Sequence, residues 1–479
     1  MPYPVVFVGG NMSQERNFTE GKILSPLIRF MVPVFLAMFL QAMYGAVDLL
    51  IVGKFASSVD VSAVSTGSQI MMTLTNLVTS FAMGTTILLG QRIGEGRGRE
   101  GGKVIGSSIC LFGVIAGVFT VLIPVLCRPL SSLMNAPEEA FDETASYIRI
   151  CGLGSLFIIS YNLIGSIFRG IGDSKTPLMT VMIAYVCNIA GDLLLVAVFG
   201  MGTAGAAAAT VAAQMISVII SLLILRRKGL PFQVERSDLG FDGGVIRKVT
   251  ALGVPIALQD FLVGISFLVL LAIVNGLGLV ASAGIGVAEK VCGFIMLIPA
   301  AFMQAMAAFV AQNIGAGKYP RAKKALVYAV AVSAMLAVVM FAVTFWRGDL
   351  LSGIFANDPE VILASADYLK AYAIDCLLTC FLFCFIGFFN GLGMTRFVMI
   401  QGIIGAFLVR IPVAFLMSRQ VPVSMFHVGL ATPCSTLLQV ALCLIWFRRA
   451  NRKYAGKESE GLSGMNLSNE KAPEGAHDD

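Results

Sequence analysis

Residues 179–199 read MTVMIAYVCNIAGDLLLVAVF, and this segment is almost wholly apolar and long enough to cross a bilayer as one helix. It nevertheless contains Asn188 and Asp192, whose side chains share a helix face because they lie four residues apart. A carboxylate at membrane depth costs about 2.5–3.5 kcal/mol on insertion scales and normally faces a protein interior or an aqueous cavity. The segment predicts a membrane helix with a functional polar face; a structural hydrogen bond between helices is the alternative.

The composition indicates that the whole chain is a membrane protein. Of its 479 residues 57% are hydrophobic and 13% are charged, whereas soluble domains carry about 25% charged residues. There is no Walker A loop and no side-chain set suited to catalysis, so we expect neither an ATPase nor an enzyme. The ten Cys lie almost all in apolar segments, which argues against disulfides and a cysteine metal site. We expect no cofactor and no cleaved signal peptide, and residues 1–11 add no recognisable element, so Met12 is an alternative start to Met1.

Apolar windows of about 20 residues mark the expected membrane helices, and Gly-rich or charged turns such as GEGRGR at 94–99 separate them. The predicted fold class is an all-α polytopic membrane protein. Its twelve expected spans are 26–52, 61–89, 104–126, 147–169, 177–199, 204–225, 250–275, 282–311, 325–345, 367–389, 397–418 and 426–447.

Basic residues gather in every second connection between these helices, whereas the other connections hold only Lys54, Arg128, Arg347 and Arg419. Because cytoplasmic connections are enriched in Lys and Arg, both termini are predicted to lie in the cytoplasm, with the chain in the plasma membrane. The same placement accounts for the net charge of +6 without a nucleic-acid partner.

The two halves of the chain repeat one another at an offset of 221 or 222 residues, as with Pro33 and Pro255. GQRIGEGRGREGGK at 90–103 corresponds to AQNIGAGKYPRAKK at 311–324, MNAPEEAFDETASYIR at 134–149 to FANDPEVILASADYLK at 355–370, and FRGIGDSKTP at 168–177 to FNGLGMTRFV at 389–398. Two six-helix bundles in parallel repeat are typical of transporters that rock about a central site. The predicted domains are a cytoplasmic segment 1–21, an amino-terminal lobe 22–225, a cytoplasmic connection 226–249, a carboxy-terminal lobe 250–450 and a disordered cytoplasmic tail 451–479.

The first expected helix also carries an acid near its end, Asp48 in MYGAVDLLIVGKF at 43–55. With this acid and the repeats, the chain resembles the multidrug and toxic compound extrusion (MATE) family over about residues 22–450. The resemblance implies a V-shaped bundle that exports organic cations or other amphiphilic compounds in exchange for Na⁺ or H⁺. It is closer to the DinF-like and archaeal branch than to the NorM branch, which places an essential Glu where this chain has Val263.

The resemblance also implies a cation-coupling site in the amino-terminal lobe. Its residues would be Asp48, Asn188, Asp192 and Thr210, with Gln41, Tyr147 and Asn162 as a supporting polar network. The residue chemistry fits, since Na⁺ prefers several oxygen ligands and a proton prefers a carboxylate that burial or a second acid makes easier to protonate. For Asp48 the alternative is an interfacial acid capped by Lys54, and for the supporting residues it is ordinary hydrogen bonding between helices.

The second half has its own polar set at membrane depth, Asp260, Lys290, Asp375 and Arg410. Two acids and two bases predict internal pairing in a structural or gating network, and contact of Asp260 or Asp375 with a cationic substrate is the alternative.

The sequence therefore predicts an antiporter that exports small amphiphilic compounds, works in the lipid bilayer as a monomer and is coupled to H⁺ or Na⁺. A flippase for a lipid-linked precursor is the second hypothesis. It would need a strongly cationic cavity, which is disfavoured because acids balance the charges of the mid-helix bases Lys290 and Arg410. A membrane enzyme is the third, against which the lack of a catalytic set argues.

Overall fold

The computed structural model describes residues 5–7, 18–232 and 234–469, and the side chains of 18–232, 234–452 and 454. Within these residues the protein is nearly all helical, with eleven helices long and apolar enough to cross a membrane. A bent pair, α4 with α5, makes a twelfth span. The predicted twelve-span, all-α fold class is therefore confirmed.

The first half of the chain comprises α1 (Leu24–Phe55), α2 (Ser58–Gly94), α3 (Gly98–Leu133), η2 (Glu138–Ala140), α4 (Phe141–Leu153), α5 (Ser155–Gly170), α6 (Lys175–Asp192), η3 (Leu193–Val198) and α7 (Gly202–Lys228). The second half comprises α8 (Gly243–Asn275), α9 (Leu279–Ile295), α10 (Leu297–Gly315), α11 (Tyr319–Gly353), α12 (Pro359–Gly391), α13 (Thr395–Ile403), η5 (Ile404–Arg410), α14 (Ile411–Ser418), α15 (Met425–Gly429) and α16 (Ala431–Asn469).

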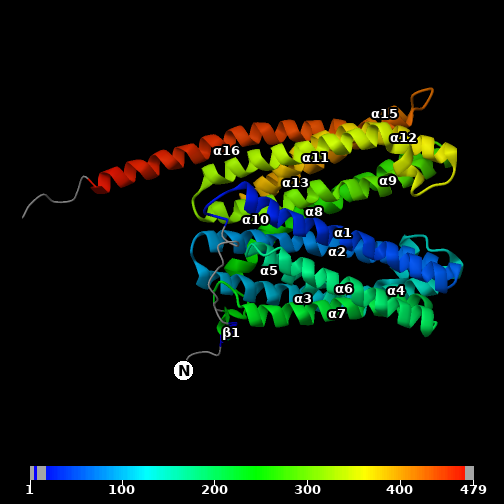
Figure 1. Ribbon diagram of the computed structural model, residues 1–479, viewed down its shortest axis with the longest axis horizontal. Coiled ribbons are helices and arrows are strands. Elements are labelled where there is room, and N and C mark those ends of the chain that lie inside the picture. Colours follow the sequence, from blue (N-terminus) through cyan, green and yellow to red (C-terminus); the bar gives the residue numbers. More distant parts are fainter. Residues whose placement is uncertain (1–4, 8–17, 233, 470–479) are drawn as a thin grey trace, which may run out of the picture.

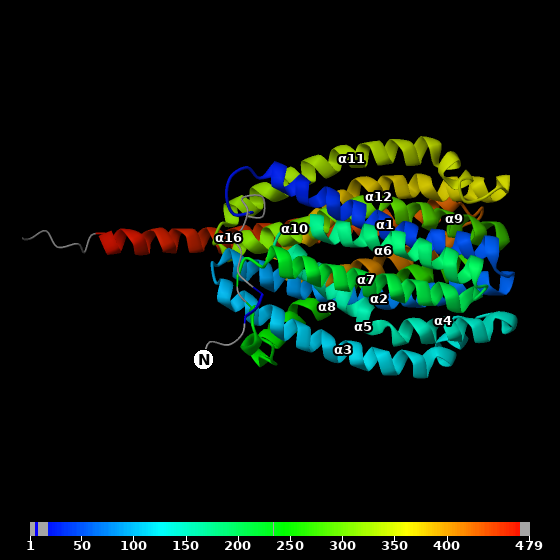
Figure 2. The ribbon, with the colours of Figure 1, turned by 60° about the horizontal axis from the view of Figure 1, so that its bottom comes forward.

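These helices run along the long axis of the molecule, and α16 extends beyond the bundle at the same end as β1, Val5–Phe7 (Figure 1). We call this the terminal end. In the turned view, α11 and α12 lie on the opposite side of the bundle from α3 and α4 (Figure 2). The helix α2 packs against α5 of its own half and against α8 and α10 of the second half, so it lies at the junction of the two halves.

Two expected spans are broken. Instead of one helix over 147–169, α4 and α5 meet at 54° around Gly154. A Cβ at Gly154 would lie 2.4 Å from Cγ2 of Val211 in α7, so glycine lets α7 pack against the break. The expected helix 282–311 divides at Met296 into α9 and α10, and Pro299 lies in the first turn of α10, where its missing N–H is tolerated.

The connection between the halves is shorter than the expected 226–249 and is packed against α3. Ser107 Oγ donates to the carbonyl oxygen of Gly240 (3.0 Å), and a Cβ at Gly101 would lie 3.0 Å from the Phe232 ring. Within this connection β2 (Val234–Glu235) pairs antiparallel with β1 (Val5–Phe7). The expectation that residues 1–11 carry no element is therefore wrong for β1.

The tail prediction is also corrected, because α16 continues to Asn469 and residues 451–469 are helical. The Tyr454 ring stacks on Tyr319 of α11 with centroids 4.3 Å apart, and the Tyr319 hydroxyl donates to Asn451 Oδ1 (2.6 Å). Extending an existing helix needs no new nucleation, so a polar sequence can continue it. Residues 470–479 of the predicted tail lie outside the described residues.

Helices α2 and α10 approach so closely at the terminal end that only glycine fits. A Cβ at Gly94 would lie 1.9 Å from the Gln312 carbonyl oxygen, and one at Gly315 would lie 2.0 Å from the Gln91 carbonyl oxygen. A small apolar core of Met83, Ile87, Ile256, Ala307 and Ala311 fills the same junction.

Two glutamines cross this junction in a symmetric pair. Gln91 Nε2 donates to the Gly391 carbonyl oxygen (3.2 Å), and Gln312 Nε2 donates to the Gly170 carbonyl oxygen (3.0 Å). Gln91 corresponds to Gln312 in the repeat, and Gly170 to Gly391, so each half reaches into the other in the same way.

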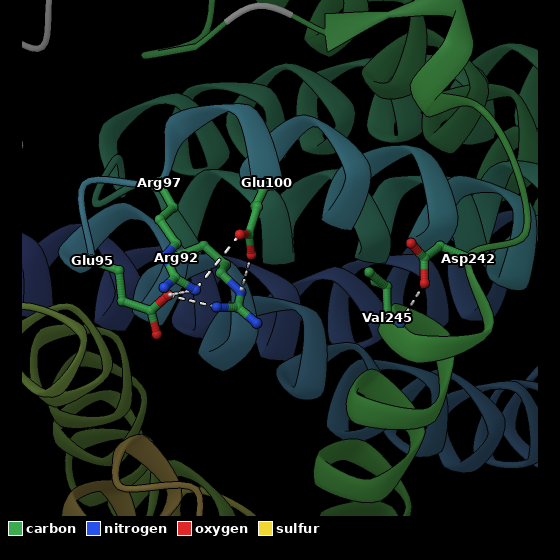
Figure 3. Close-up of polar contacts among 6 residues, drawn as sticks. All are labelled: Arg92, Glu95, Arg97, Glu100, Asp242 and Val245. Atoms are coloured by element: carbon green, nitrogen blue, oxygen red, sulfur yellow. Dashed lines mark hydrogen bonds and ion pairs between the residues drawn. The ribbon is translucent and has the colours of Figure 1, made fainter.

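Ion pairs and a cap fix the backbone near this junction. Arg92 contacts Glu95 at 2.5 Å and Glu100 at 3.3 Å, and Arg97 reaches both acids at 3.6 Å (Figure 3). Figure 3 also shows Asp242, which caps α8 by accepting from the N–H of Val245 (3.0 Å). Such partly exposed pairs add little stability, about 0–1 kcal/mol each, but they set the geometry of the α2–α3 turn.

The chain just before α1 is held by the second half. Phe18 is buried against Phe309, with ring centroids 5.1 Å apart. The Arg321 guanidinium donates to the carbonyl oxygens of residues 18, 20, 21 and 22 at 2.6–3.1 Å. This contact ties the start of the first half to α10 and α11.

Candidate functional site

Three helices of the first half bring the predicted coupling residues together. Asp48 on α1 is 3% exposed, and Asn188 and Asp192 on α6 are 0% exposed. Asp48 interacts electrostatically with Asp192 and lies beside the Asn188 amide and the Thr210 hydroxyl of α7. The sequence spacing placed Asn188 and Asp192 on one face, and the packing of α6 against α1 and α7 makes that face the site.

The polar atoms of this site lack hydrogen bonds among the described residues. They are Asp48 Oδ1, both Asp192 carboxylate oxygens, both polar atoms of the Asn188 amide, Thr210 Oγ1 and the Tyr44 hydroxyl. In the described part of the protein neither carboxylate has an ion pair with Lys or Arg, so the alternative that Lys54 caps Asp48 does not hold. Two buried acids without a base are costly unless a cation or protons neutralise them.

The backbone changes its form next to this site. The helix α6 ends at Asp192, and the π-helical turn η3 begins at the following residue. Single π-helical turns inside helices are rare and are frequent at functional sites.

Of the three predicted supporting residues, the structure places one in the cluster. Tyr147 on α4 is 3% exposed and lies beside Asp48 and Thr210. Gln41 is exposed and donates instead to the Tyr161 hydroxyl of α5 (3.3 Å). Asn162 Oδ1 accepts a hydrogen bond from Thr79 Oγ1 of α2 (2.7 Å). This is the ordinary hydrogen bond between helices that was the alternative for this residue.

Sequence reasoning missed further members of the site. Tyr44 precedes Asp48 by four residues and interacts with both acids, and Cys151 follows Tyr147 by four residues. Their spacing of four residues from Asp48 and Tyr147 places them on the same helix faces, and this spacing could have predicted them.

The four polar residues predicted to pair in the second half lie in three different places. Asp375 on α12 and Arg410 at the end of η5 are buried and interact electrostatically. Asp260 on α8 instead accepts a hydrogen bond from Ser80 of α2, across the junction of the halves. Lys290 is exposed and has no ion pair in the part of the chain that the structure describes. The expected four-residue network does not form among the described residues, because only Asp375 and Arg410 interact electrostatically.

Arg169 is the last residue of the expected span 147–169, and its side chain turns back along α5. A Cβ at Gly165 would lie 3.3 Å from Arg169 Nη1, and Arg169 interacts electrostatically with Tyr161. Its Nε atom is buried without a hydrogen bond among the described residues.

Comparison with known proteins gives consistent results across the chain. The MatE family model matches residues 33–194 and again residues 255–416. The chain is 27% identical over 433 residues to the "Probable multidrug resistance protein YpnP" of Bacillus subtilis (strain 168), covering 90% of this chain and 96% of that protein. It is 24% identical over 402 residues to the "Multidrug export protein MepA" of Staphylococcus saprophyticus, covering 84% and 88%.

Solved structures share the fold at lower sequence identity. A multidrug resistance MATE family transporter in an outward-facing conformation matches with a TM-score of 0.87 and 17% identity, over 93% of this chain and 100% of that one. A MATE protein in a bent conformation matches with the same TM-score and identity, over 94% and 100%.

The fold and the buried acidic site define a multi-pass membrane transporter rather than an enzyme. The chain belongs to the MatE family, whose model covers both halves of the repeat. The resemblance found in the sequence is thereby confirmed, while its assignment to the DinF-like branch stays a prediction.

Proposed function

We propose that this protein is a multidrug efflux antiporter that exports amphiphilic or cationic organic compounds in exchange for H⁺ or Na⁺. The observation that carries the proposal is the pair of buried acids, Asp48 and Asp192, which have no basic partner among the described residues. The names of the relatives YpnP and MepA support export of several drugs as the transported function.

The side chains around the two acids suit either ion. Na⁺ takes several oxygen ligands, and the two carboxylates, the Asn188 amide, the Thr210 hydroxyl and the Tyr44 hydroxyl supply oxygens from three helices. Protons would neutralise the same carboxylates directly. Both ions therefore compete for one site, and the transport assay decides which of them drives export.

Coupling follows from the position of the site between helices. A cation that binds better when α1, α6 and α7 are packed as they are here favours this arrangement over one in which the helices separate. If the substrate favours the other arrangement, each ligand promotes release of the other, and the ion gradient drives export. No ATP is needed for this cycle.

The test is dye efflux by the full chain reconstituted in liposomes, under an imposed pH gradient or an imposed Na⁺ gradient. We expect wild type to transport under one of the two gradients, which identifies the ion. Asp48→Asn and Asp192→Asn should each reduce gradient-driven efflux at least tenfold, because either change removes a charge that the coupling ion must meet.

The matched control is Asp349→Asn, which changes the same residue type at an exposed position whose nearest Arg347 nitrogen is 3.9 Å away. It should transport as wild type does. Normal gradient-driven efflux by both site variants would show that the acids are structural. If wild type transports under neither gradient, multidrug export is contradicted, and the flippase hypothesis would then be tested with a lipid-linked precursor.

The setting in the membrane is part of the proposal. The basic connections of the chain lie at the terminal end, and the positive-inside rule then places this end and both termini in the cytoplasm of a plasma-membrane protein. We also propose that one chain suffices for transport, since both halves of the repeat are present in it. Protease protection in sealed vesicles and the mass of the purified particle check these two points.

A further inference from the structure

The first half has a polar cavity between α3 and α4, which lie along one side of the bundle (Figure 2). The volume of the cavity is about 260 Å³, and its lining residues are Arg128 of α3 and Asp142, Ala145, Ser146 and Arg149 of α4. The four α4 residues share one helix face, because they recur at i, i+3, i+4 and i+7. The cavity lies towards the end of α3 that is opposite the terminal end.

The side chains of this cavity carry one more positive charge than negative charge. Arg128 Nη2 pairs with Asp142 Oδ1 at 2.7 Å, and the Arg128 guanidinium lies 6.0 Å from the centroid of the Phe141 ring. Arg149 is exposed and has no carboxylate partner in the part of the chain that the structure describes. Its Nη2 donates a long hydrogen bond to Cys127 Sγ (3.9 Å). The Arg149 guanidinium is therefore available to an anion.

A hydrophobic groove runs along the outward surface of α3. Its volume is about 480 Å³, and the residues that line it are Gly117, Val118, Val121, Leu122 and Val125, all of which are exposed. A Cβ at Gly117 would have nothing within 4 Å, so the missing side chain leaves a notch in this surface. In a membrane-spanning helix such an exposed apolar surface is in contact with acyl chains.

The groove leads to the polar cavity along a single stripe of α3. Gly117, Val121, Val125 and Arg128 recur at helical spacing, so they lie on one face. At 1.5 Å per residue, the groove extends about 12 Å from Gly117 to Val125, and Arg128 lies about 4.5 Å further along the axis. The hydrocarbon of one leaflet is about 15 Å thick, half of the bilayer core. The two features together therefore have the length and polarity of a phospholipid.

We propose that this surface is a binding site for an anionic phospholipid. The headgroup phosphate lies between Arg149 and Arg128, whose guanidinium groups donate paired hydrogen bonds to phosphate oxygens, and the Ser146 hydroxyl supplies a further donor. An acyl chain fills the notch at Gly117. The single negative charge of the lipid balances the positive charge that Asp142 leaves uncompensated. A zwitterionic lipid binds less well, because its ammonium adds a positive charge beside the two guanidinium groups.

The test is photocrosslinking of the full chain in phosphatidylcholine vesicles. The probe is phosphatidylglycerol with a photoactivatable acyl chain, present in both leaflets, and peptide mass spectrometry locates the crosslinks. We expect crosslinks at residues 117–125. Excess unlabelled phosphatidylglycerol should compete with the probe, and phosphatidylethanolamine with the same chains should not. Glycerol phosphate, which has the anionic group without the chains, should not compete either, and this arm separates a lipid from a free phosphate ester.

Two variants test the two parts of the site. Arg149→Gln should lower the crosslinking yield at 117–125 about tenfold, because it removes the guanidinium that has no carboxylate partner. Gly117→Leu should also lower the yield, because the new side chain fills the notch. The matched control is Arg419→Gln, which removes another exposed guanidinium from the same end of the molecule. Arg419 also lies over an aromatic ring, that of Phe415 at 4.5 Å, and its loss should leave the yield at 117–125 unchanged.

Equal competition by phosphatidylethanolamine and phosphatidylglycerol would overturn the proposal, as would an unchanged yield in a folded Arg149→Gln. Absence of wild-type crosslinks at 117–125 would also overturn it, and competition by glycerol phosphate as effective as that by the lipid would assign the cavity to a free phosphate ester instead. The competition arms use wild type alone, so they decide the matter even if a variant does not fold. No arm measures transport, so the result is separate from that of the efflux assay.

Discussion

At the residue scale, the Thr210 hydroxyl is expected to contribute to the affinity of the site for the coupling ion. Its hydroxyl lies beside Asp48 and has no hydrogen bond among the described residues. Thr210→Val keeps the side-chain shape and removes this oxygen. We expect the apparent affinity for the coupling ion to fall about tenfold or more, since an interaction with a charged group is worth about 1.5–3 kcal/mol.

The measurement is the dependence of efflux rate on Na⁺ concentration or pH. The control is Thr73→Val on α2, where the exposed hydroxyl donates to the carbonyl oxygen of Gln69 (2.9 Å). Equal ion affinities for the two variants would mean that Thr210 is not a ligand.

At the scale of the element, the ends of α2 and α10 depend on glycine. A Cβ at Gly94 or Gly315 would meet a backbone carbonyl oxygen, which cannot rotate away as a side chain can. Gly94→Ala and Gly315→Ala should therefore force the two helices apart and destabilise this form by about 1–3 kcal/mol. Thermal unfolding of the purified protein measures the loss.

The matched control is Gly113→Ala on α3, where a Cβ would have nothing within 4 Å. This change replaces glycine by a better helix former, so it should be neutral or slightly stabilising. A melting temperature for Gly94→Ala equal to that of the control would show that α2 and α10 are not in contact in solution.

The π-helical turns are a second feature of element scale. One begins directly after Asp192 and the other ends at Arg410, so each adjoins a buried charged side chain. A π-helical turn shifts the register of the helix face, which lets a charged residue point inward while its apolar neighbours keep their positions.

At the scale of the whole molecule, several polar contacts between the two halves lie at the terminal end. Gln91, Gln312 and the Arg321 contact with residues 18–22 all lie there. Under alternating access this junction must open in another state of the cycle. The symmetric glutamine bonds therefore contribute directly to the balance between states.

Removing both glutamine side chains should shift this balance. Each bond contributes about 0.5–1.5 kcal/mol, so Gln91→Ala/Gln312→Ala should raise the open population by roughly 5- to 150-fold. Hydrogen exchange at 89–95 and 309–316 should then become faster. Gln420→Ala, at an exposed position in the connection 419–424, is the control. Unchanged exchange in the double variant would show that the glutamines do not hold the junction.

Sequence alone determined the class of fold and the repeat, because hydropathy and periodicity are local properties that the bilayer imposes on each span. It also determined that Asn188 and Asp192 share a face, since helix geometry fixes that spacing. The clustering of basic residues in every second connection is likewise a property of the sequence. The turn of the Arg169 side chain back along α5 is not, because it depends on the space beside Gly165.

Only the tertiary structure decided which polar faces meet. It placed Tyr44 and Tyr147 beside Asp48 and Gln41 beside Tyr161. It also left Lys290 exposed and buried Arg410. These outcomes depend on the rotation and contact of helices far apart in the sequence, which a local pattern does not encode. The close approach of Gly94 to Gln312 is decided in the same way, by backbone packing between the two halves.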